Sequence, residues 1–366
     1  MSMTLETEPL KLPLHDEHIR KGARMGDFGG WLVPLFYTSI MEEHAAVRTK
    51  AGLFDISHMG EFLVEGSKAV DYLEKNLPRR ITPVKFSQAI YMPLVNDRGG
   101  MVDDIIVYRM AEQKFLIIVN AGNIEKDFAW FKARVTQGVT VTDLSQEMGL
   151  LALQGPLSQT IILECFGAFY KDLRRFHYKD FEGGVIARTG YTGEDGYEIM
   201  VPKAKLKQIW DLLFRVGEKH GLLPVGFGAR DTLRLEAAMP LYGHELTDEL
   251  TPLEADLSWA IDLTKDVFPG SAILKEQKKS GVLKKRIGFE MVERGIPRQG
   301  FEIQKDGKVI GAVTSGSFIP TTGKNIGMAY VVAAEARPGN TIDVMVRGKA
   351  VKAAVVSLPF YKRSQG

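Results

Sequence analysis

Three short apolar runs between residues 89 and 123 constrain the fold more than any other part of this chain. They are Ile90–Val95, Met101–Tyr108 and Phe115–Val119. Runs of this length, rich in Ile, Val and Tyr and bounded by turn residues, are typical of β-strands. Residues 96–100 have strong turn composition, and connections this short favour antiparallel neighbours. The stretch therefore predicts a three-stranded antiparallel meander.

Two adjacent carboxylates, Asp103 and Asp104, open the middle strand of this predicted meander. Successive side chains of a strand point to opposite faces, so Asp104 shares a face with Ile106 and Tyr108, whereas Asp103 faces away. A carboxylate on a mostly apolar face needs a partner or a chemical role. The alternative is that the strand begins in solvent and that both acids cap the turn.

The elements around the meander indicate an α+β fold. A strand at Gly60–Val64 and a helix capped by Ser67 come before it. The amphipathic helix Asn123–Val135 follows, with Ile124, Phe128, Phe131 and Val135 on its apolar face. This order predicts an antiparallel sheet with helices on one side.

The chain after Arg286 is strand-like throughout. Its six short apolar runs are Ile287–Met291, Phe301–Gln304, Val309–Thr314, Ile326–Val331, Thr341–Val346 and Ala350–Ser357. Asp306-Gly307 and Arg347-Gly348 have the composition of two-residue hairpin turns. The segment therefore predicts a small all-β barrel or sandwich, separated from the preceding chain by a lysine-rich linker.

Composition excludes several classes of function. A net charge of +2 is too balanced for nucleic acid or an acidic membrane as the main partner, and no apolar run has the length of a membrane span. Cys165 is the only cysteine, which fits a reducing compartment, and its packing predicts an inert thiol. His15 and His18 share the spacing of one helical face, but we expect surface histidines on a helix over 15–25 and no metal site. The N-terminal segment has no signal or transit pattern, so we expect a bacterial cytoplasmic protein or a mature mitochondrial matrix form.

Three further segments are candidates for ligand contact. Residues 25–34 are expected to form a glycine-rich loop whose aromatic side chains pack. In 183–201, a strand pair flanks a loop with Gly190, Gly193 and Gly196, so Tyr191 and Glu194 either contact a ligand or belong to a solvated hairpin loop. A helix beginning near residue 229 places Arg230 in its first turn, where a cation opposes the helix dipole. Arg230 therefore forms either a structural ion pair or a contact to a ligand carboxylate.

Taken together, the motifs of this chain closely resemble the folate-dependent aminomethyltransferases of the glycine cleavage system, the T proteins. The resemblance covers Leu14 to Arg363, and it rests on AGLFDISHM, NDRGGMVDD, IIVNAGN, LQGP, TGYTGEDGYEI, GFGARDTLRLEAAMPLYGHEL, TSGSFIPT and PFYKR in this order. It implies a three-domain cloverleaf around tetrahydrofolate, with a ferredoxin-like unit and a C-terminal β-barrel. The implied domains are a folate-binding region over 1–275, made of two interleaved α+β subdomains of which one spans about 56–144, a linker over 276–285 and a barrel over 286–366.

The resemblance also implies a reaction and its participants. The methylene of an aminomethyl group held on the lipoyl arm of H protein would pass to tetrahydrofolate. The products would be 5,10-methylenetetrahydrofolate, ammonia and dihydrolipoyl H protein, with a functional link to the P and L proteins. Related folate domains of dimethylglycine and sarcosine dehydrogenases carry a flavin domain for which this chain has no room. Folate-binding iron–sulfur assembly factors carry a K-G-C-Y-x-G-Q motif that is missing here. A folate-binding module without transferase activity remains an alternative.

The resemblance assigns roles to single residues. Asp104 matches the essential aspartate of the family, and Asn120 matches a residue that bonds the pterin edge. The other positions that match the folate site are Met59, Tyr91, Tyr191, Glu194 and Arg230, with Trp259 as a weaker match. The nucleophile is a nitrogen of the folate, so the protein has to position groups and supply a carboxylate that manages protons as ammonia leaves.

Overall fold

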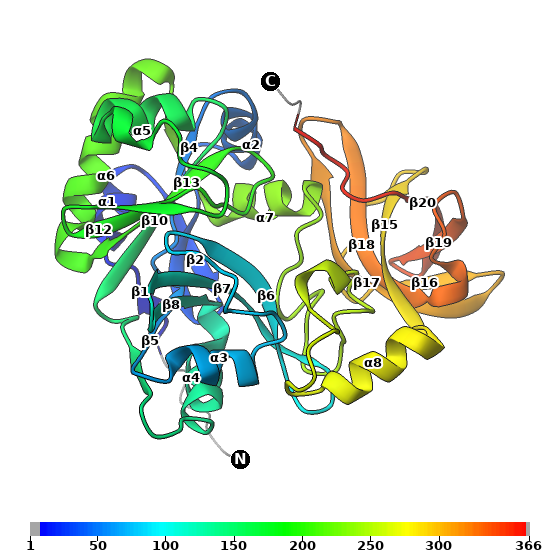
Figure 1. Cartoon of the computed structure of the whole chain (residues 1–366). Helices are drawn as coiled ribbons and strands as arrows, with labels where there is room; N and C mark the ends of the chain where they lie inside the picture. The colour runs from blue at the N-terminus through cyan, green and yellow to red at the C-terminus, as the bar shows by residue number, and fades with distance from the viewer. Residues whose placement is uncertain (1–7, 364–366) are drawn as a thin grey trace, which may run out of the picture. The chain divides into compact units, whose positions relative to one another are not determined.

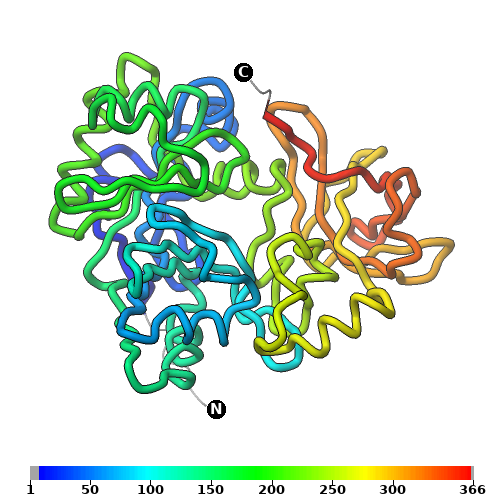
Figure 2. The backbone as a smooth tube through the Cα atoms, in the orientation of Figure 1, coloured from blue at the N-terminus to red at the C-terminus, as the bar shows by residue number. Residues whose placement is uncertain are grey.

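The computed structural model describes residues 8–363, in which the chain forms two compact units. Unit 1 comprises Met1–Gly60, Leu144–Gly190 and Glu194–Asp231. Unit 2 comprises Glu61–Asp143, Tyr191–Gly193 and Thr232–Gly366. The tube in Figure 2 follows the chain through the blue start of unit 1, the cyan start of unit 2, the green return to unit 1 and the yellow-to-red remainder of unit 2. The chain therefore builds each unit from segments that are distant in sequence.

A six-stranded sheet, in the order β11-β12-β13-β10-β4-β14, forms the centre of unit 1. Its strands are β4 (Gly52–Asp55), β10 (Met148–Gln154), β11 (Tyr178–Phe181), β12 (Gly184–Ala187), β13 (Gly196–Pro202) and β14 (Leu223–Pro224). Helices α5 (Ser158–Phe166) and α6 (Lys203–Gly217) pack on it through one apolar cluster that includes Ile161, Leu206 and Trp210. The remaining elements of unit 1 are β1 (Leu10–Lys11), α1 (His15–Arg20), β2 (Arg24–Phe28), β3 (Trp31–Phe36) and α2 (Ile40–Thr49). Figure 1 shows α5 and α6 together over the sheet.

Residues 15–36 differ from the sequence-based expectation. The helix predicted over 15–25 ends at Arg20, and the predicted loop over 25–34 is the antiparallel hairpin of β2 and β3, with Phe28 opposite Trp31. The reason is the turn between the two strands. Gly29 and Gly30 have φ values of +61° and +83°, the backbone that a two-residue hairpin turn requires. The glycines that suggested a loop are therefore the tip of a hairpin. The expectation that the aromatic side chains pack is confirmed for Trp31, which is buried, whereas Phe28 is 37% exposed.

Unit 2 contains the predicted meander as β6 (Ala89–Val95), β7 (Met101–Ala111) and β8 (Lys114–Val119), paired antiparallel. With β5 (Gly60–Glu65) and β9 (Thr140–Asp143) they form a five-stranded sheet in the order β6-β7-β8-β5-β9. Helices α3 (Ala69–Asn76) and α4 (Ile124–Lys132) pack on one face of it within a single apolar cluster, and Figure 1 shows them side by side. The predicted α+β unit with helices on one side is confirmed.

The C-terminal part of unit 2 is a closed barrel in the order β15-β18-β17-β16-β19-β20. Every neighbouring pair of strands in it is antiparallel, and β20 closes the barrel on β15. Asp306-Gly307 and Arg347-Gly348 have positive φ at both residues, as type I′ hairpin turns require. The six predicted strands correspond to β15 (Lys284–Met291), β16 (Glu302–Lys305), β17 (Lys308–Ile319), β18 (Lys324–Val332), β19 (Thr341–Val346) and β20 (Lys349–Val356).

Two α-helices lie between β14 and the barrel in sequence. Helix α7 (Phe227–Glu236) runs from the last segment of unit 1 into unit 2, and α8 (Ser271–Ser280) occupies the first half of the predicted linker. The single-turn 3₁₀ helices are Ala121–Asn123, Ala168–Tyr170, Glu218–His220, Ser258–Ala260 and Ala333–Glu335. The predicted division into domains stays a prediction. The outer ends of the predicted domains, residues 1–7 and 364–366, lie outside the described residues. The same holds for the first residues of the N-terminal segment in which no signal or transit pattern was expected. Within residues 8–363, no helix combines the length and apolarity needed to cross a membrane.

Candidate active site

The two aspartates that open β7 face opposite sides of the five-stranded sheet. In the β6–β7 register, Pro93 lies opposite Asp104 and Tyr91 lies opposite Ile106, so Tyr91 and Asp104 are on one face. Asp103 is on the face covered by α4 and has no solvent exposure, whereas Asp104 keeps partial exposure. The alternative that both acids begin the strand in solvent and cap the turn is therefore wrong for Asp103.

Asn120, directly after β8, connects the two carboxylates. Its backbone N–H donates to Oδ2 of Asp103 at 2.9 Å, and its side-chain amide donates to Oδ1 of Asp103 at 2.7 Å and to Oδ1 of Asp104 at 2.8 Å. The antiparallel pairing of β7 with β8 brings these residues together although they are 16 and 17 positions apart. Asn120 thus fixes the side chain of Asp104 relative to the strand behind it.

The surroundings of Asp104 suit it to exchange a proton near neutral pH. Burial, together with the charge of Asp103, raises the pKa of Asp104 from 3.8 to about 7, against the opposing effects of Tyr91 and Asn120. A group that titrates near neutral pH has both protonation states available for acid–base catalysis. Asp104 is therefore the strongest candidate for a proton-transferring group in the sheet of unit 2.

An aromatic pair lies next to Asp104. The rings of Tyr91 and Trp259 are stacked with their centroids 5.6 Å apart and their planes inclined by 22°. Trp259 is 62% exposed, although large aromatic side chains usually bury most of their surface. The Tyr91 hydroxyl is buried and faces the Asp104 carboxylate without reaching hydrogen-bond geometry to any residue in 8–363, and burial raises its pKa. The pair offers a flat apolar surface beside a carboxylate.

Tyr191 is the fifth candidate residue in unit 2. Its hydroxyl donates to the backbone carbonyl of Pro240, and its ring is half-buried. Tyr191 also adds to the effects that raise the pKa of Tyr91. Asp104, Asn120, Tyr91, Trp259 and Tyr191 thus belong to one connected region of unit 2.

The other three candidates, Met59, Glu194 and Arg230, belong to unit 1. Met59 is half-buried in the turn that follows β4. Glu194 is almost completely buried and accepts a hydrogen bond from Arg48 at 3.0 Å, which makes it half of an internal ion pair. Arg230 is in the first turn of α7, where its charge acts on two neighbours that the sequence did not single out, His58 and Glu198.

His58 is a buried ionisable group, and Glu198 is a half-buried one. Burial and the charge of Arg230 lower the pKa of His58 to about 3, so the imidazole is neutral. Its ring contacts Phe28 and Phe227 edge-on, and its Nδ1 has no partner within residues 8–363. Burial raises the pKa of Glu198, whose carboxylate accepts a hydrogen bond from the Thr189 hydroxyl. The signal for Glu198 was available, since it is a carboxylate within an apolar strand run, as Asp104 is.

Local packing explains why glycines occupy positions 190 and 196, at and beside the loop between β12 and β13. A Cβ atom on Gly190 would lie 2.0 Å from Oε1 of Gln154, and one on Gly196 would lie 2.3 Å from its Nε2. Gln154 in turn donates to the carbonyl of Thr189 at 3.2 Å. These two glycines therefore admit the Gln154 side chain, and only Gly193, at φ +80°, needs a left-handed backbone.

Of the two histidines near the N-terminus within residues 8–363, His18 differs from the expectation. His18 is completely buried, not at the surface as expected, because its Nε2 bonds Asp55 at 2.9 Å and its Nδ1 bonds the Tyr37 hydroxyl at 2.9 Å. Within the part of the chain that the structure describes, no three His, Cys, Asp or Glu side chains are arranged to hold a metal ion.

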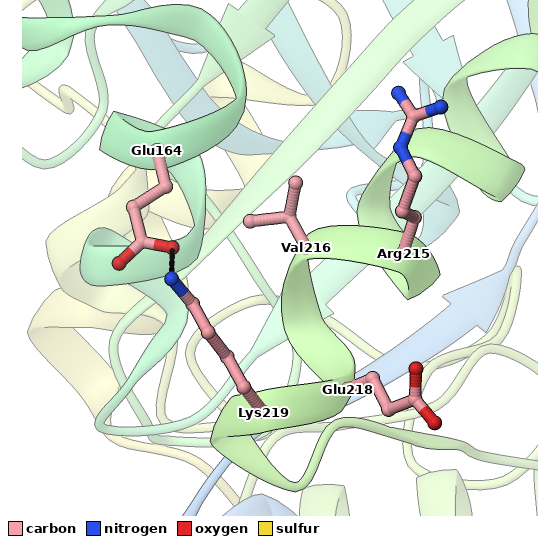
Figure 3. A pocket seen from close by; sticks show the side chains of 5 residues that line it. All are labelled: Glu164, Arg215, Val216, Glu218 and Lys219. Carbon is pink, nitrogen blue, oxygen red and sulfur yellow. Dashed lines mark ion pairs between the residues drawn. The ribbon is translucent and has the colours of Figure 1, made fainter.

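A shallow hollow of about 520 Å³ lies over α5 and the end of α6 (Figure 3), lined by Glu164, Arg215, Val216, Glu218 and Lys219. Glu164 forms an ion pair there with Lys219 at 2.8 Å and a hydrogen bond with Nε2 of His220 at 3.1 Å. Burial raises the pKa of the neighbouring Cys165 thiol to about 11, so it stays protonated and weakly reactive, as expected. An exposed ion pair of this kind is typical of an ordinary protein surface.

Known proteins share this fold and sequence over almost the whole chain. A family model described as the GCVT N-terminal domain matches residues 14–265, and one described as the glycine cleavage T-protein C-terminal barrel domain matches residues 284–362. The aminomethyltransferases of Natranaerobius thermophilus and Desulfitobacterium hafniense are each 44% identical to the chain. Both matches cover 98% of the chain, and they cover 100% and 99% of the two relatives.

A solved structure, the glycine cleavage system aminomethyltransferase T from Bartonella henselae, superposes with a TM-score of 0.92 at 37% identity. The match covers 96% of this chain and 98% of that one. The chain therefore belongs to the glycine cleavage T-protein family, with the activity of an aminomethyltransferase of the glycine cleavage system.

Proposed function

We propose that the region around Asp104 carries the transfer and that the acceptor is tetrahydrofolate. The observation that carries this proposal is Asp104 itself, a carboxylate whose pKa is raised to about 7 beside a stacked aromatic pair of which Trp259 is exposed. A pterin is a flat ring system with a polar edge. Such a ring needs an aromatic surface to stack on and amide or carboxylate groups at its edge, and Trp259, Tyr91, Asn120 and Asp104 supply these.

The donor in this proposal is the aminomethyl group held as a thioether on the lipoyl arm of H protein. When bound, tetrahydrofolate supplies the two nitrogens that take over the methylene carbon. The carbon loses its bonds to sulfur and to the amine and gains two bonds to nitrogen. One of the two protons lost by those nitrogens ends on the lipoyl sulfur, which leaves as a thiol. The other ends on the amine, which leaves as ammonia.

Asp104 acts in its ionised form in this mechanism. The carboxylate accepts a proton from the attacking nitrogen and stabilises the positive charge that develops near it. Asn120 holds the carboxylate in place through its side-chain amide. Because the ionised form is the active one, turnover should rise with pH through the pKa of Asp104.

The remaining candidate residues position the acceptor in this proposal. Tyr191 completes the aromatic surface, and Met59 supplies an apolar contact. Arg230 contacts the pterin or the glutamyl carboxylate of folate, and Glu194 is oriented by Arg48 as a hydrogen-bond acceptor. We also propose the division into a folate-binding region over 1–275, a linker over 276–285 and a barrel over 286–366. A cytoplasmic location is proposed because the relatives named above are bacterial.

The test is the release of ammonia from aminomethyl-lipoyl H protein by the purified protein, with and without tetrahydrofolate. Release that depends on tetrahydrofolate supports the proposal. If release is absent but tetrahydrofolate raises the melting temperature, the protein binds folate without transferring the group, and the proposal is wrong. Saturation at about a hundred times Kd adds roughly 2.7 kcal/mol to the free energy of unfolding, so such a shift is measurable.

A further inference from the structure

A third carboxyl group lies behind the two aspartates of β7. Asp127, in the first turn of α4, is completely buried and lies beside Asp103, on the covered face of the sheet. Neither of its oxygens receives a hydrogen bond from any residue in 8–363. A buried carboxylate without a donor is costly, so the protonation state of this side chain needs an explanation.

The donors around the cluster are unevenly distributed. Asp103 accepts hydrogen bonds from the Asn120 backbone, from the Asn120 side chain and from the Asn123 side chain, which lies 2.7 Å away. Each of these donors is an N–H group that suits a carboxylate anion. Asp127 has none, and two carboxyl groups side by side cannot both be ionised in a buried site.

The other charged and titratable groups near Asp127 do not replace a missing donor. Lys126, the residue before Asp127 on α4, donates to the Tyr242 hydroxyl at 2.5 Å and lies 3.3 Å from Asp248. Tyr242 also bonds Asp248 at 3.0 Å. Asp104 adds a second negative charge that acts on Asp127. The lysine is thus held by the loop that follows α7, and the side chain that acts most strongly on Asp127 is another carboxylate, that of Asp103.

We propose that Asp127 is a positioning residue that keeps a proton and donates it to Asp103, which fixes the Asp103–Asn120 pair that holds Asp104. In this arrangement Asp103 accepts a fourth hydrogen bond, and Asn120 stays aligned between the two β7 aspartates. The electrostatics agree, because burial and the charge of Asp103 raise the pKa of Asp127 to about 11. The effect on Asp104 rests on the proposed function, whereas the proton on Asp127 does not.

Infrared spectroscopy of the full chain tests the proton directly. At about pH 9, the difference spectrum between wild type and Asp127→Asn should contain the carbonyl stretch of one protonated carboxylic acid. Absence of this band would mean that Asp127 is ionised, and the proposal would fail. The measurement needs neither folate nor H protein, so a failure of the proposed function leaves it unaffected.

The pH dependence of ammonia release tests the positioning. Asp127→Ala removes the donor that holds the Asp103 carboxylate in place, so Asp103 should raise the pKa of Asp104 less. We expect turnover to fall roughly 10- to 100-fold through misplacement, with the rising limb of the profile displaced to lower pH. Asp127→Asn retains an N–H donor and should recover most of the lost turnover and the wild-type limb.

Two outcomes of the same measurement would contradict the positioning role. The first is that Asp127→Asn behaves like Asp127→Ala, which would mean that the charge of Asp127 is needed. The second is that neither variant moves the limb, which would reduce Asp127 to a packing role. If Asp127→Ala fails to fold, the pH profile of Asp127→Asn alone tests the proposal. If Asp127 is ionised in the wild type, Asp127→Asn removes a negative charge and should displace the rising limb of turnover.

Discussion

Replacing Asp127 by asparagine should make the protein more stable, by an amount that grows with pH. The folded protein holds the Asp127 proton because its pKa is raised from 3.8 to about 11, whereas the unfolded chain loses that proton above about pH 4. Between these values the unfolded state binds one proton fewer, so the free energy of unfolding falls by about 1.4 kcal/mol per pH unit. Asparagine cannot ionise, so the Asp127→Asn variant does not lose this free energy of unfolding as pH rises.

The size of the gain at neutral pH follows from the same numbers. From pH 3.8 to pH 7 the accumulated penalty is about 4 kcal/mol, taking Asp127 as fully buried. The asparagine amide can donate to Asp103 but leaves a second polar atom without a partner, which costs about 1–3 kcal/mol. The net gain at pH 7 is therefore about 1–3 kcal/mol. The slope with pH does not depend on this offset, which makes it the better observable.

The assay is urea unfolding at about pH 5.5, 7 and 8.5, with hydrogen exchange of the α4 amides identifying the transition that contains this helix. Asp97→Asn is the matched control, because Asp97 lies in unit 2 with a side chain 82% exposed. The stability difference between wild type and Asp127→Asn should widen with pH, whereas that of Asp97→Asn should stay flat. A difference for Asp127→Asn that does not change with pH would refute the protonated state of Asp127.

Three further predictions concern single side chains. Asp104→Asn should retain affinity for tetrahydrofolate but lower turnover by roughly 10²–10⁴-fold, because the proton acceptor is lost; unchanged turnover with H protein would exclude this role. Arg230→Ala should mainly weaken folate binding, and calorimetry that returns wild-type affinity would contradict an anchoring role. The pKa of His58 is lowered to about 3 in the folded protein, against 6.5 in the unfolded chain. Below pH 6.5 the unfolded chain therefore binds one more proton than the folded protein, and the free energy of unfolding falls as pH falls. At about pH 5 the loss is about 2 kcal/mol, and His58→Phe should remove it; equal acid sensitivity of the two proteins in thermal unfolding would count against this.

Local periodicity predicted the elements that support the site. The meander, its antiparallel pairing and the opposite orientations of Asp103 and Asp104 follow from a side-chain period of two residues. The barrel strands and their turns followed from composition in the same way. These features depend on neighbours in sequence or on short connections, which a sequence pattern contains.

The errors and omissions share another cause. His18 was expected at the surface because its partners, Tyr37 and Asp55, lie 19 and 37 residues away. Arg48 pairs with Glu194 across 146 positions, which no local pattern can indicate.

The position of Asp127, in contrast, can be read from the local pattern of the sequence. Asp127 lies three positions after Ile124 and four before Phe131, on the face of α4 that packs in the core. A carboxylate at an apolar helical position carries the same information as one on an apolar strand face.

The adjacent aspartates of β7 have different tasks because the strand turns them to different environments. Asp103 points under α4, has no contact with solvent and collects three N–H donors, so its charge is fixed and internal. Asp104 points to the other face, keeps partial exposure and receives one side-chain amide, so its proton can exchange. The charge of Asp103 is one reason that the pKa of Asp104 is raised to about 7. Asp103→Asn would therefore move the rising limb of turnover to lower pH by on the order of one unit, whereas a purely structural Asp103 would lower turnover at every pH alike.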